Sequence, residues 1–169
     1  MTTKWTIKSA PDSEIVESFK ESLGVPPIIA TLLAQRDIST FDEAKRFFRP
    51  QLDHLHDPFL MKDMRVAVDR LFTAISNNEK ILVYGDYDVD GTTSVSMMYT
   101  FLKQITDNVY YYIPDRYNEG YGVSFLGIDY AVQNDFSLII TLDCGIKANE
   151  KVDYANEKNI DFKLNLSNF

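Results

Sequence analysis

The segment ILVYGDYDVDGTTS, residues 81–94, joins an apolar run to three aspartates that are spaced two residues apart. The run ILVYG has the length and the apolar composition of a strand that is buried on both faces of a sheet. Asp86, Asp88 and Asp90 repel one another at this spacing unless a cation lies among them. If the strand continues in extended form, the three carboxylates share one face, because side chains alternate along a strand. The segment therefore predicts a buried strand that ends at a charged site.

Strands and helices alternate from residue 80 onward. KILVYG, NVYYYI and SLIITLD have the composition of strands, and segments with helical spacing separate them. Such alternation predicts parallel strands joined by right-handed crossovers. Before residue 79 the spacing is helical, with helix-start signals such as the capping-box pair Thr40 and Glu43. We expect an α/β fold: a parallel sheet of three or four strands with flanking helices over residues 79–169, preceded by a helical N-terminal annex over residues 1–78.

The composition limits the classes of protein to which this chain can belong. Of the 169 residues, 45% are hydrophobic, which is typical of a packed globular core, and Cys144 is the single cysteine. One cysteine excludes an intrachain disulfide and favours a reducing, cytoplasmic location. No apolar run approaches the roughly 20 residues that cross a bilayer, so we expect no membrane association. The net charge of −8 argues against a broad basic face for duplex nucleic acid, although bound metal ions would attract phosphate.

A second acidic motif follows the strand SLIITLD. Asp143 ends that run and precedes Cys144 and Gly145, which repeats the order of apolar strand, carboxylate and glycine. In open parallel sheets ligands bind beyond the carboxyl ends of the strands, where both motifs are expected to lie. All-oxygen ligation suits hard cations such as Mg²⁺ or Mn²⁺. The two motifs together predict a metal site formed by Asp86, Asp88 and Asp143.

The first motif has two other interpretations. An EF-hand calcium loop also begins D-x-D-x-D-G, but its twelfth position requires a glutamate where this chain has Met97. The motif also follows a strand, whereas an EF-hand loop follows a helix. The other interpretation is a solvated acidic turn whose aspartates only cap the next helix, and the second motif counts against it.

Residues after the aspartates suggest an anion pocket. Gly91 permits a tight turn, and Thr92, Thr93 and Ser94 offer hydroxyls and free backbone N–H groups at the expected helix start. Helix starts of this kind bind phosphate. The same element is therefore predicted to supply metal ligands and a phosphate site.

The segment IPDRYNEGYG carries further candidates. Arg116 lies just past a strand end, where it either pairs with Glu119 or Asp115 or binds a phosphate in bidentate fashion. Tyr117 and Tyr121 are either ordinary surface aromatics or platforms on which bases stack.

The cysteine and the two histidines have plainer interpretations. Cys144 has no suitably spaced cysteine or histidine partner, so packing is favoured over nucleophilic or metal-binding chemistry. His54 and His56 form an H-x-H pattern well before the sheet, where an ordinary loop is favoured over metal ligation.

At this point the chain resembles a known family. YGDYDVDGTTS resembles the first motif of the DHH phosphoesterases and TLDCG their second. IPDRYNEGYG, LHDPFLMKDM and the helical N-terminus are similar to the RecJ branch, the bacterial 5′→3′ exonucleases specific for single-stranded DNA. The resemblance implies metal-dependent phosphodiester hydrolysis with two Mn²⁺ or Mg²⁺ ions, with Asp86, Asp88 and Asp143 as metal ligands and single-stranded DNA as the substrate. It also implies that Asp90 supports the loop, and that Tyr84 replaces a histidine found in some relatives.

The chain departs from the family pattern near its end. Relatives continue from the segment matching NIDF into a strand that ends in Asp-His-His, whereas this chain reads NIDFKLNLSNF. We expect KLNLSNF to be an edge strand or a frayed tail, and the phosphoesterase domain to be incomplete, truncated and inactive alone. The alternatives are a DHH-type phosphodiesterase for short oligonucleotides or cyclic dinucleotides, and a catalytically dead nucleic-acid-binding module. Nothing in the sequence indicates an oligomeric state.

Overall fold

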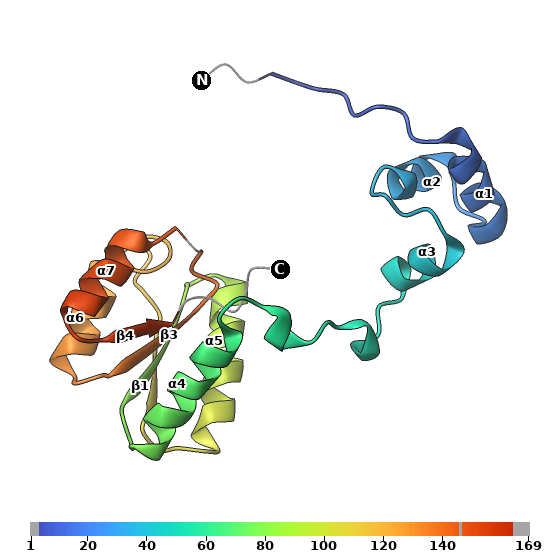
Figure 1. The fold of residues 1–169 in the computed structure, drawn as a ribbon. Helices are drawn as coiled ribbons and strands as arrows, with labels where there is room; N and C mark the ends of the chain where they lie inside the picture. Colours follow the sequence, from blue (N-terminus) through green and yellow to red (C-terminus); the bar gives the residue numbers. More distant parts are fainter. Residues whose placement is uncertain (1–3, 146, 164–169) are drawn as a thin grey trace. The chain divides into compact units, whose positions relative to one another are not determined.

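The computed structural model describes residues 4–145 and 147–163, which form two compact units with the boundary between Leu60 and Met61 (Figure 1). The boundary lies earlier than the one expected at residue 78. The reason is the amphipathic helix α4, Met64–Ser76, which directs Ala74 into the same apolar core as the first strand of the sheet. The segment 61–78 therefore belongs with the α/β unit and not with the N-terminal helices.

The first unit is a small group of helices. Its elements are α1 (Ser13–Leu23), α2 (Pro27–Ala34), α3 (Phe41–Phe48) and the short 3-10 helices η1 (Leu52–His54) and η2 (Pro58–Leu60). Phe19, Ala30, Leu33 and Ala44 form its buried core.

Local sequence signals set the ends of these helices. The Asp12 carboxylate accepts a hydrogen bond from the backbone N–H of Glu14, and α1 ends at Gly24, whose positive φ of 63° suits glycine. The predicted capping box is present at α3, where Thr40 and Glu43 exchange side-chain and backbone hydrogen bonds.

The second unit is an α/β domain. After α4 its elements are β1 (Ile81–Gly85), α5 (Val89–Lys103), β2 (Val109–Tyr112), α6 (Phe125–Gln133), β3 (Leu138–Leu142), α7 (Asn149–Glu157) and β4 (Asp161–Lys163). The strands are all parallel, in the order β2-β1-β3-β4, which confirms the predicted fold class and strand number. β4 lies at an edge, and the rest of the predicted edge segment, residues 164–169, lies outside the described residues.

Helices cover both faces of this sheet (Figure 1). Leu82, Tyr84 and Ile139 pack into one core with residues of α6 and α7, whereas Ile81 and Val83 pack into another with residues of α4 and α5. Because β1 and β3 are buried on both faces, each is a continuous apolar run. Among the described residues no helix is both long and apolar enough to cross a membrane.

Candidate functional site

Two acidic motifs follow the ends of the adjacent central strands. β1 and β3 are hydrogen-bonded in parallel register, with Gly85 opposite Leu142. The next residue of each strand is an aspartate, so Asp86 and Asp143 follow paired positions at the carboxyl edge of the sheet. This edge is where ligands bind in open parallel sheets.

Asp86 has an unusual environment for a carboxylate. The residue is fully buried, and its Oδ1 accepts a hydrogen bond of 3.0 Å from the backbone N–H of Gly122. Its Oδ2 is also buried, and among the described residues it has no hydrogen-bond partner. A buried carboxylate oxygen without a partner destabilises the fold. A divalent cation bound at Oδ2 would remove that penalty, so this orphaned atom fits a metal ligand.

Asp88 is the N-cap of α5. Its Oδ1 accepts a hydrogen bond of 2.9 Å from the backbone N–H of Gly91. A Cβ atom at Gly91 would lie 2.4 Å from the backbone oxygen of Asp86, so only glycine lets α5 begin this close to the strand end. Gly91 was predicted to permit a tight turn; its role in the structure is this close packing of the helix start against the backbone of Asp86.

The carboxylates act on one another electrostatically. Burial raises the pKa of Asp143, and the negative charges of Asp88, Asp90 and Asp86 raise it further. Burial and then the charges of Asp143, Asp86 and Asp88 also raise the pKa of Tyr121. Among the residues that the structure describes, no three histidine, cysteine, aspartate or glutamate side chains are already grouped to hold an ion. The role of the three aspartates as metal ligands therefore stays a prediction.

Two features of the first motif differ from the simplest expectation, because the strand does not continue in extended form through Asp90. Asp90 does not share an extended face with Asp86 and Asp88, because β1 ends at Gly85 and α5 begins at Val89; Asp90 is exposed in the first turn of the helix.

The free N–H groups expected from Thr92 to Ser94 are also not at the helix start. Thr92 donates its backbone N–H to the carbonyl of Asp88, and the hydroxyls of Thr92 and Ser94 bond to carbonyls of the preceding turn. Phosphate binding by Thr92 and Thr93 stays a prediction, but the Thr92 hydroxyl would have to give up its bond to the Asp88 carbonyl to take part.

Arg116 lies over the ring of Tyr87, 5.3 Å from the ring centroid, and makes no ion pair within the described part of the chain. Tyr87 in turn contacts Tyr121 edge to face at 6.1 Å. Tyr87 directly follows Asp86, so a guanidinium and two tyrosines adjoin the aspartates. Of the two alternatives for Arg116, the pairing with Glu119 or Asp115 is not formed, because both carboxylates accept backbone N–H groups of the loop itself.

Glu119 organises this loop. Its Oε1 accepts hydrogen bonds from the backbone N–H of Asp115 at 2.7 Å and from the hydroxyl of Tyr112 at 2.9 Å, and its Oε2 binds the Ser124 hydroxyl. Tyr84 is fully buried, donates its hydroxyl to the Gly122 carbonyl and accepts the N–H of Ser124.

These contacts hold the segment whose Gly122 N–H binds Asp86. The sequence did not reveal the roles of Glu119 and Gly122, for which the EGYG spacing was the available signal. Gly122 binds a residue 36 positions away, and Glu119 binds groups in and next to the loop at irregular spacings of four, five and seven positions.

The remaining candidates make contacts or adopt backbone conformations that belong to the fold itself. Cys144 is buried, donates its thiol to the Leu142 carbonyl at 3.2 Å, and has its pKa raised by burial to about 12, which agrees with a packing role. Gly145 has a positive φ of 68°, which suits glycine after Asp143. In the first unit, His54 Nδ1 accepts the backbone N–H of Gln51.

The chain is similar to proteins of one known family. The model of the DHH family, N-terminal domain, matches residues 80–164. The single-stranded-DNA-specific exonuclease RecJ of Bacillus subtilis is 42% identical over 94% of this chain, and that of Escherichia coli is 28% identical over 87%. The chain spans only 20% and 25% of the lengths of these two relatives.

Solved structures of RecJ also match the chain. A crystal structure of exonuclease RecJ bound to manganese matches 64% of this chain with a TM-score of 0.57 and 29% identity, and the chain covers 28% of it. RecJ from Thermus thermophilus, in complex with Mn²⁺, matches 94% of this chain with a TM-score of 0.61 and shares the fold at 23% identity; the chain covers 22% of it.

Proposed function

Because the chain belongs to the DHH family, we propose that its acidic strand ends bind divalent metal ions, Mn²⁺ or Mg²⁺, for hydrolysis of phosphodiester bonds. The proposed substrate is single-stranded DNA, on which the RecJ relatives that match most of this chain are specific exonucleases. The proposed direction, 5′→3′, is the one that the family resemblance implies. The observation that carries the metal site is the buried Oδ2 of Asp86, which has no partner among the described residues.

A separate observation supports the proposed role of each aspartate. Oδ1 of Asp86 accepts the Gly122 N–H, which orients the carboxylate and leaves Oδ2 available for a metal ion. Asp88 is held in place as the N-cap of α5. Asp143 follows the strand that pairs with β1 and experiences the charges of both. Fixed carboxylate oxygens at one sheet edge are the ligand type that Mg²⁺ and Mn²⁺ prefer.

When bound, divalent ions supply an activated water and stabilise the charge that develops on the phosphoryl group. The residues of this chain position the substrate around that chemistry. Arg116 is well placed to hold a phosphate next to the aspartates, because no carboxylate of residues 4–145 and 147–163 pairs with its guanidinium and it lies on the ring of Tyr87. Tyr121, which is 61% exposed, offers a ring on which a terminal base can stack.

The 169 residues contain no Asp-His-His sequence, so part of the family's ligand set is missing from them. Losing ligands or their supporting groups usually costs about 10–100-fold in affinity or activity. We therefore expect weak Mn²⁺ binding by this chain, with a dissociation constant on the order of millimolar, and no exonuclease activity above background.

The test is a calorimetric Mn²⁺ titration of the chain beside two variants with the same change of charge. Asp88→Asn keeps a helix cap, since asparagine caps as well as aspartate, but it removes the anionic ligand. Asp107→Asn removes an exposed charge that precedes β2, at the opposite edge of the sheet. Binding should be lost in Asp88→Asn and kept in Asp107→Asn.

Equal binding in all three proteins would contradict the proposed metal site. The matching activity assay follows degradation of a 5′-labelled single strand with Mn²⁺. Robust degradation by the unaltered chain that is lost in Asp88→Asn would show that the first two motifs act without Asp-His-His.

A further inference from the structure

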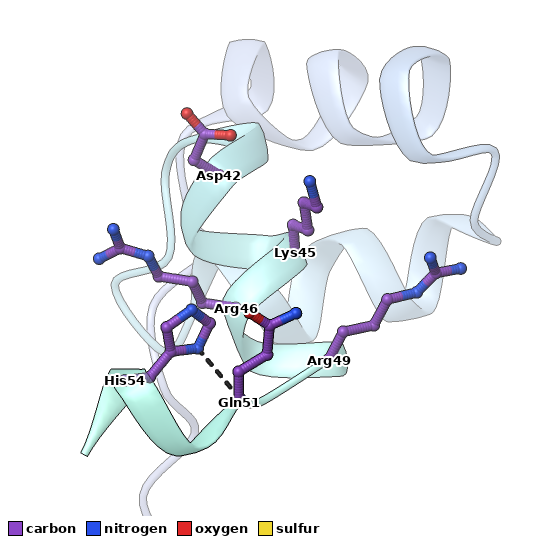
Figure 2. A pocket seen from close by; sticks show the side chains of 6 residues that line it. All are labelled: Asp42, Lys45, Arg46, Arg49, Gln51 and His54. Carbon is purple, nitrogen blue, oxygen red and sulfur yellow. Dashed lines mark hydrogen bonds between the residues drawn. The ribbon is translucent and has the colours of Figure 1, made fainter.

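A second candidate site lies in the first unit, on α3. Two cavities there share Lys45 and Arg49 as lining residues. The first has a volume of about 430 Å³ and is lined by Asp42, Lys45, Arg46, Arg49, Gln51 and His54 (Figure 2). The second has a volume of about 510 Å³ and is lined by Ser22, Leu23, Val25, Phe41, Lys45, Phe48 and Arg49. A charged cavity and a largely apolar cavity therefore adjoin each other on α3, where they share Lys45 and Arg49.

The charge of the first cavity differs from that of the unit around it. Residues 1–60 carry seven lysines and arginines against nine aspartates and glutamates, yet three of the seven cations, Lys45, Arg46 and Arg49, line this cavity. None of the three makes an ion pair within the described residues. Cations in the last turn of a helix gain a little from its dipole, but that gain does not require three of them without anionic partners.

The cationic groups point in different directions. Figure 2 shows the guanidinium groups of Arg46 and Arg49 pointing away from each other, with Lys45 extending from a separate position on the helix. A single small anion would need these groups to converge on it. Cations spread along a surface instead fit a polyanion whose phosphates are spaced along a backbone.

Exposed aromatic rings lie beside these cations. Phe41 and Phe48 line the second cavity, and each is 50% exposed. Phe47 is 53% exposed and contacts Phe48 edge to face at 5.5 Å. Stacking of bases on aromatic rings next to a basic groove is how proteins bind single strands without regard to sequence.

We infer that the surface formed by Lys45, Arg46, Arg49, Phe41 and Phe48 binds single-stranded DNA, with phosphates on the cations and bases against the rings. The inference rests on the proposed function for its substrate class, but it concerns a separate site in a separate unit. An acidic peptide is the competing ligand. The presence of exposed rings beside the cations favours a nucleic acid, which presents bases as well as phosphates.

The experiment measures fluorescence anisotropy of a labelled thymidine oligomer of about 15 nucleotides, in EDTA, with the whole chain at several salt concentrations. The variant Lys45→Gln/Arg46→Gln/Arg49→Gln should bind at least about tenfold more weakly, and the slope of log K against log salt should fall by about 2, since each single-strand phosphate contact contributes about 0.7.

The control variant is Lys8→Gln/Lys20→Gln/Arg36→Gln, which removes three charges from the same unit outside both cavities. It should keep the slope of the unaltered chain. Equal losses in the two triple variants would overturn the inference, because they would show an effect of net charge only. Circular dichroism of both variants checks that they are folded.

Phe48→Leu tests the rings without leaving a large void. It should weaken binding of the thymidine oligomer about fivefold or more and leave binding of an abasic strand of equal length unchanged. Equal effects on both strands would overturn the stacking part of the inference. A labelled oligoglutamate bound more tightly than the DNA through the same residues would reassign the surface to an acidic protein partner.

The assay in EDTA contains no metal, so its outcome is independent of the proposed metal centre. Oligomer binding that depends on Lys45, Arg46 and Arg49 supports this site even where the Mn²⁺ titration fails. Retained oligomer binding in their triple variant overturns this site even where Asp88→Asn abolishes Mn²⁺ binding.

Discussion

Replacing Asp86 with asparagine separates the contribution of this residue to folding from its proposed contribution to metal binding. The asparagine keeps an oxygen at the Oδ1 position for the Gly122 N–H, and it replaces the unpartnered Oδ2 with an uncharged amide. An unpartnered buried polar group costs about 1–3 kcal/mol, and a charged one costs more. The substitution also removes one of the charges that raise the pKa of Asp143.

Without metal, Asp86→Asn is therefore expected to be more stable than the unaltered chain, by about 1 kcal/mol of unfolding free energy. With Mn²⁺ at about ten times its dissociation constant, the unaltered chain gains about 1.4 kcal/mol, whereas the variant gains almost nothing. The order of stability is thus expected to reverse between the two conditions.

The assay is urea unfolding followed by circular dichroism, in EDTA and in Mn²⁺, with Asp107→Asn as the variant that should respond to Mn²⁺ like the unaltered chain. An Asp86→Asn variant that is less stable than the unaltered chain in EDTA by more than about 1 kcal/mol would refute the reasoning, because it would make the carboxylate a structural group. Equal stabilisation of both proteins by Mn²⁺ would refute it as well.

Two further predictions concern packing around the sheet. Gly91→Ala should lower the unfolding free energy by about 1–3 kcal/mol, because its Cβ would lie 2.4 Å from the Asp86 carbonyl oxygen. If urea unfolding instead shows an unfolding free energy that is higher by about 1 kcal/mol, the usual gain of alanine in a helix, this packing is contradicted. Glu79→Gln should lower the unfolding free energy by about 1–2 kcal/mol, because Glu79 binds the half-buried guanidinium of Arg70 at 2.7 Å. Asp107→Asn, in an exposed ion pair, should leave thermal unfolding unchanged, and equal effects of the two substitutions would show that burial does not matter here.

The parts of the fold that the sequence predicted are those set by local signals. The runs around β1 and β3 are apolar throughout because both faces are covered, and the caps at Asp12 and Thr40 depend only on residues two or three positions away. The carboxyl-edge location of Asp86 and Asp143 followed from the parallel arrangement that strand–helix alternation implies.

Features that depend on distant partners were not predictable in the same way. The shared face of the three aspartates required the strand to continue through Asp90, and the apolar run does not show that the helix begins at Val89. The bond from Gly122 to Asp86 joins residues 36 positions apart, and only the folded loop brings them together. The unit boundary was misplaced because helical spacing in α4 does not say which core the helix joins.

The central claim is that a divalent cation binds where Asp86, Asp88 and Asp143 follow the strand ends. The most direct measurement is Mn²⁺-induced paramagnetic broadening of the backbone amide signals of the isotope-labelled chain, since the broadening falls steeply with distance from the ion. We predict that the amides of Gly91 and Gly122 broaden first and that Asp86→Asn abolishes the effect. Broadening centred on His54, or spread evenly over the acidic surface and unchanged in the variant, would contradict the account.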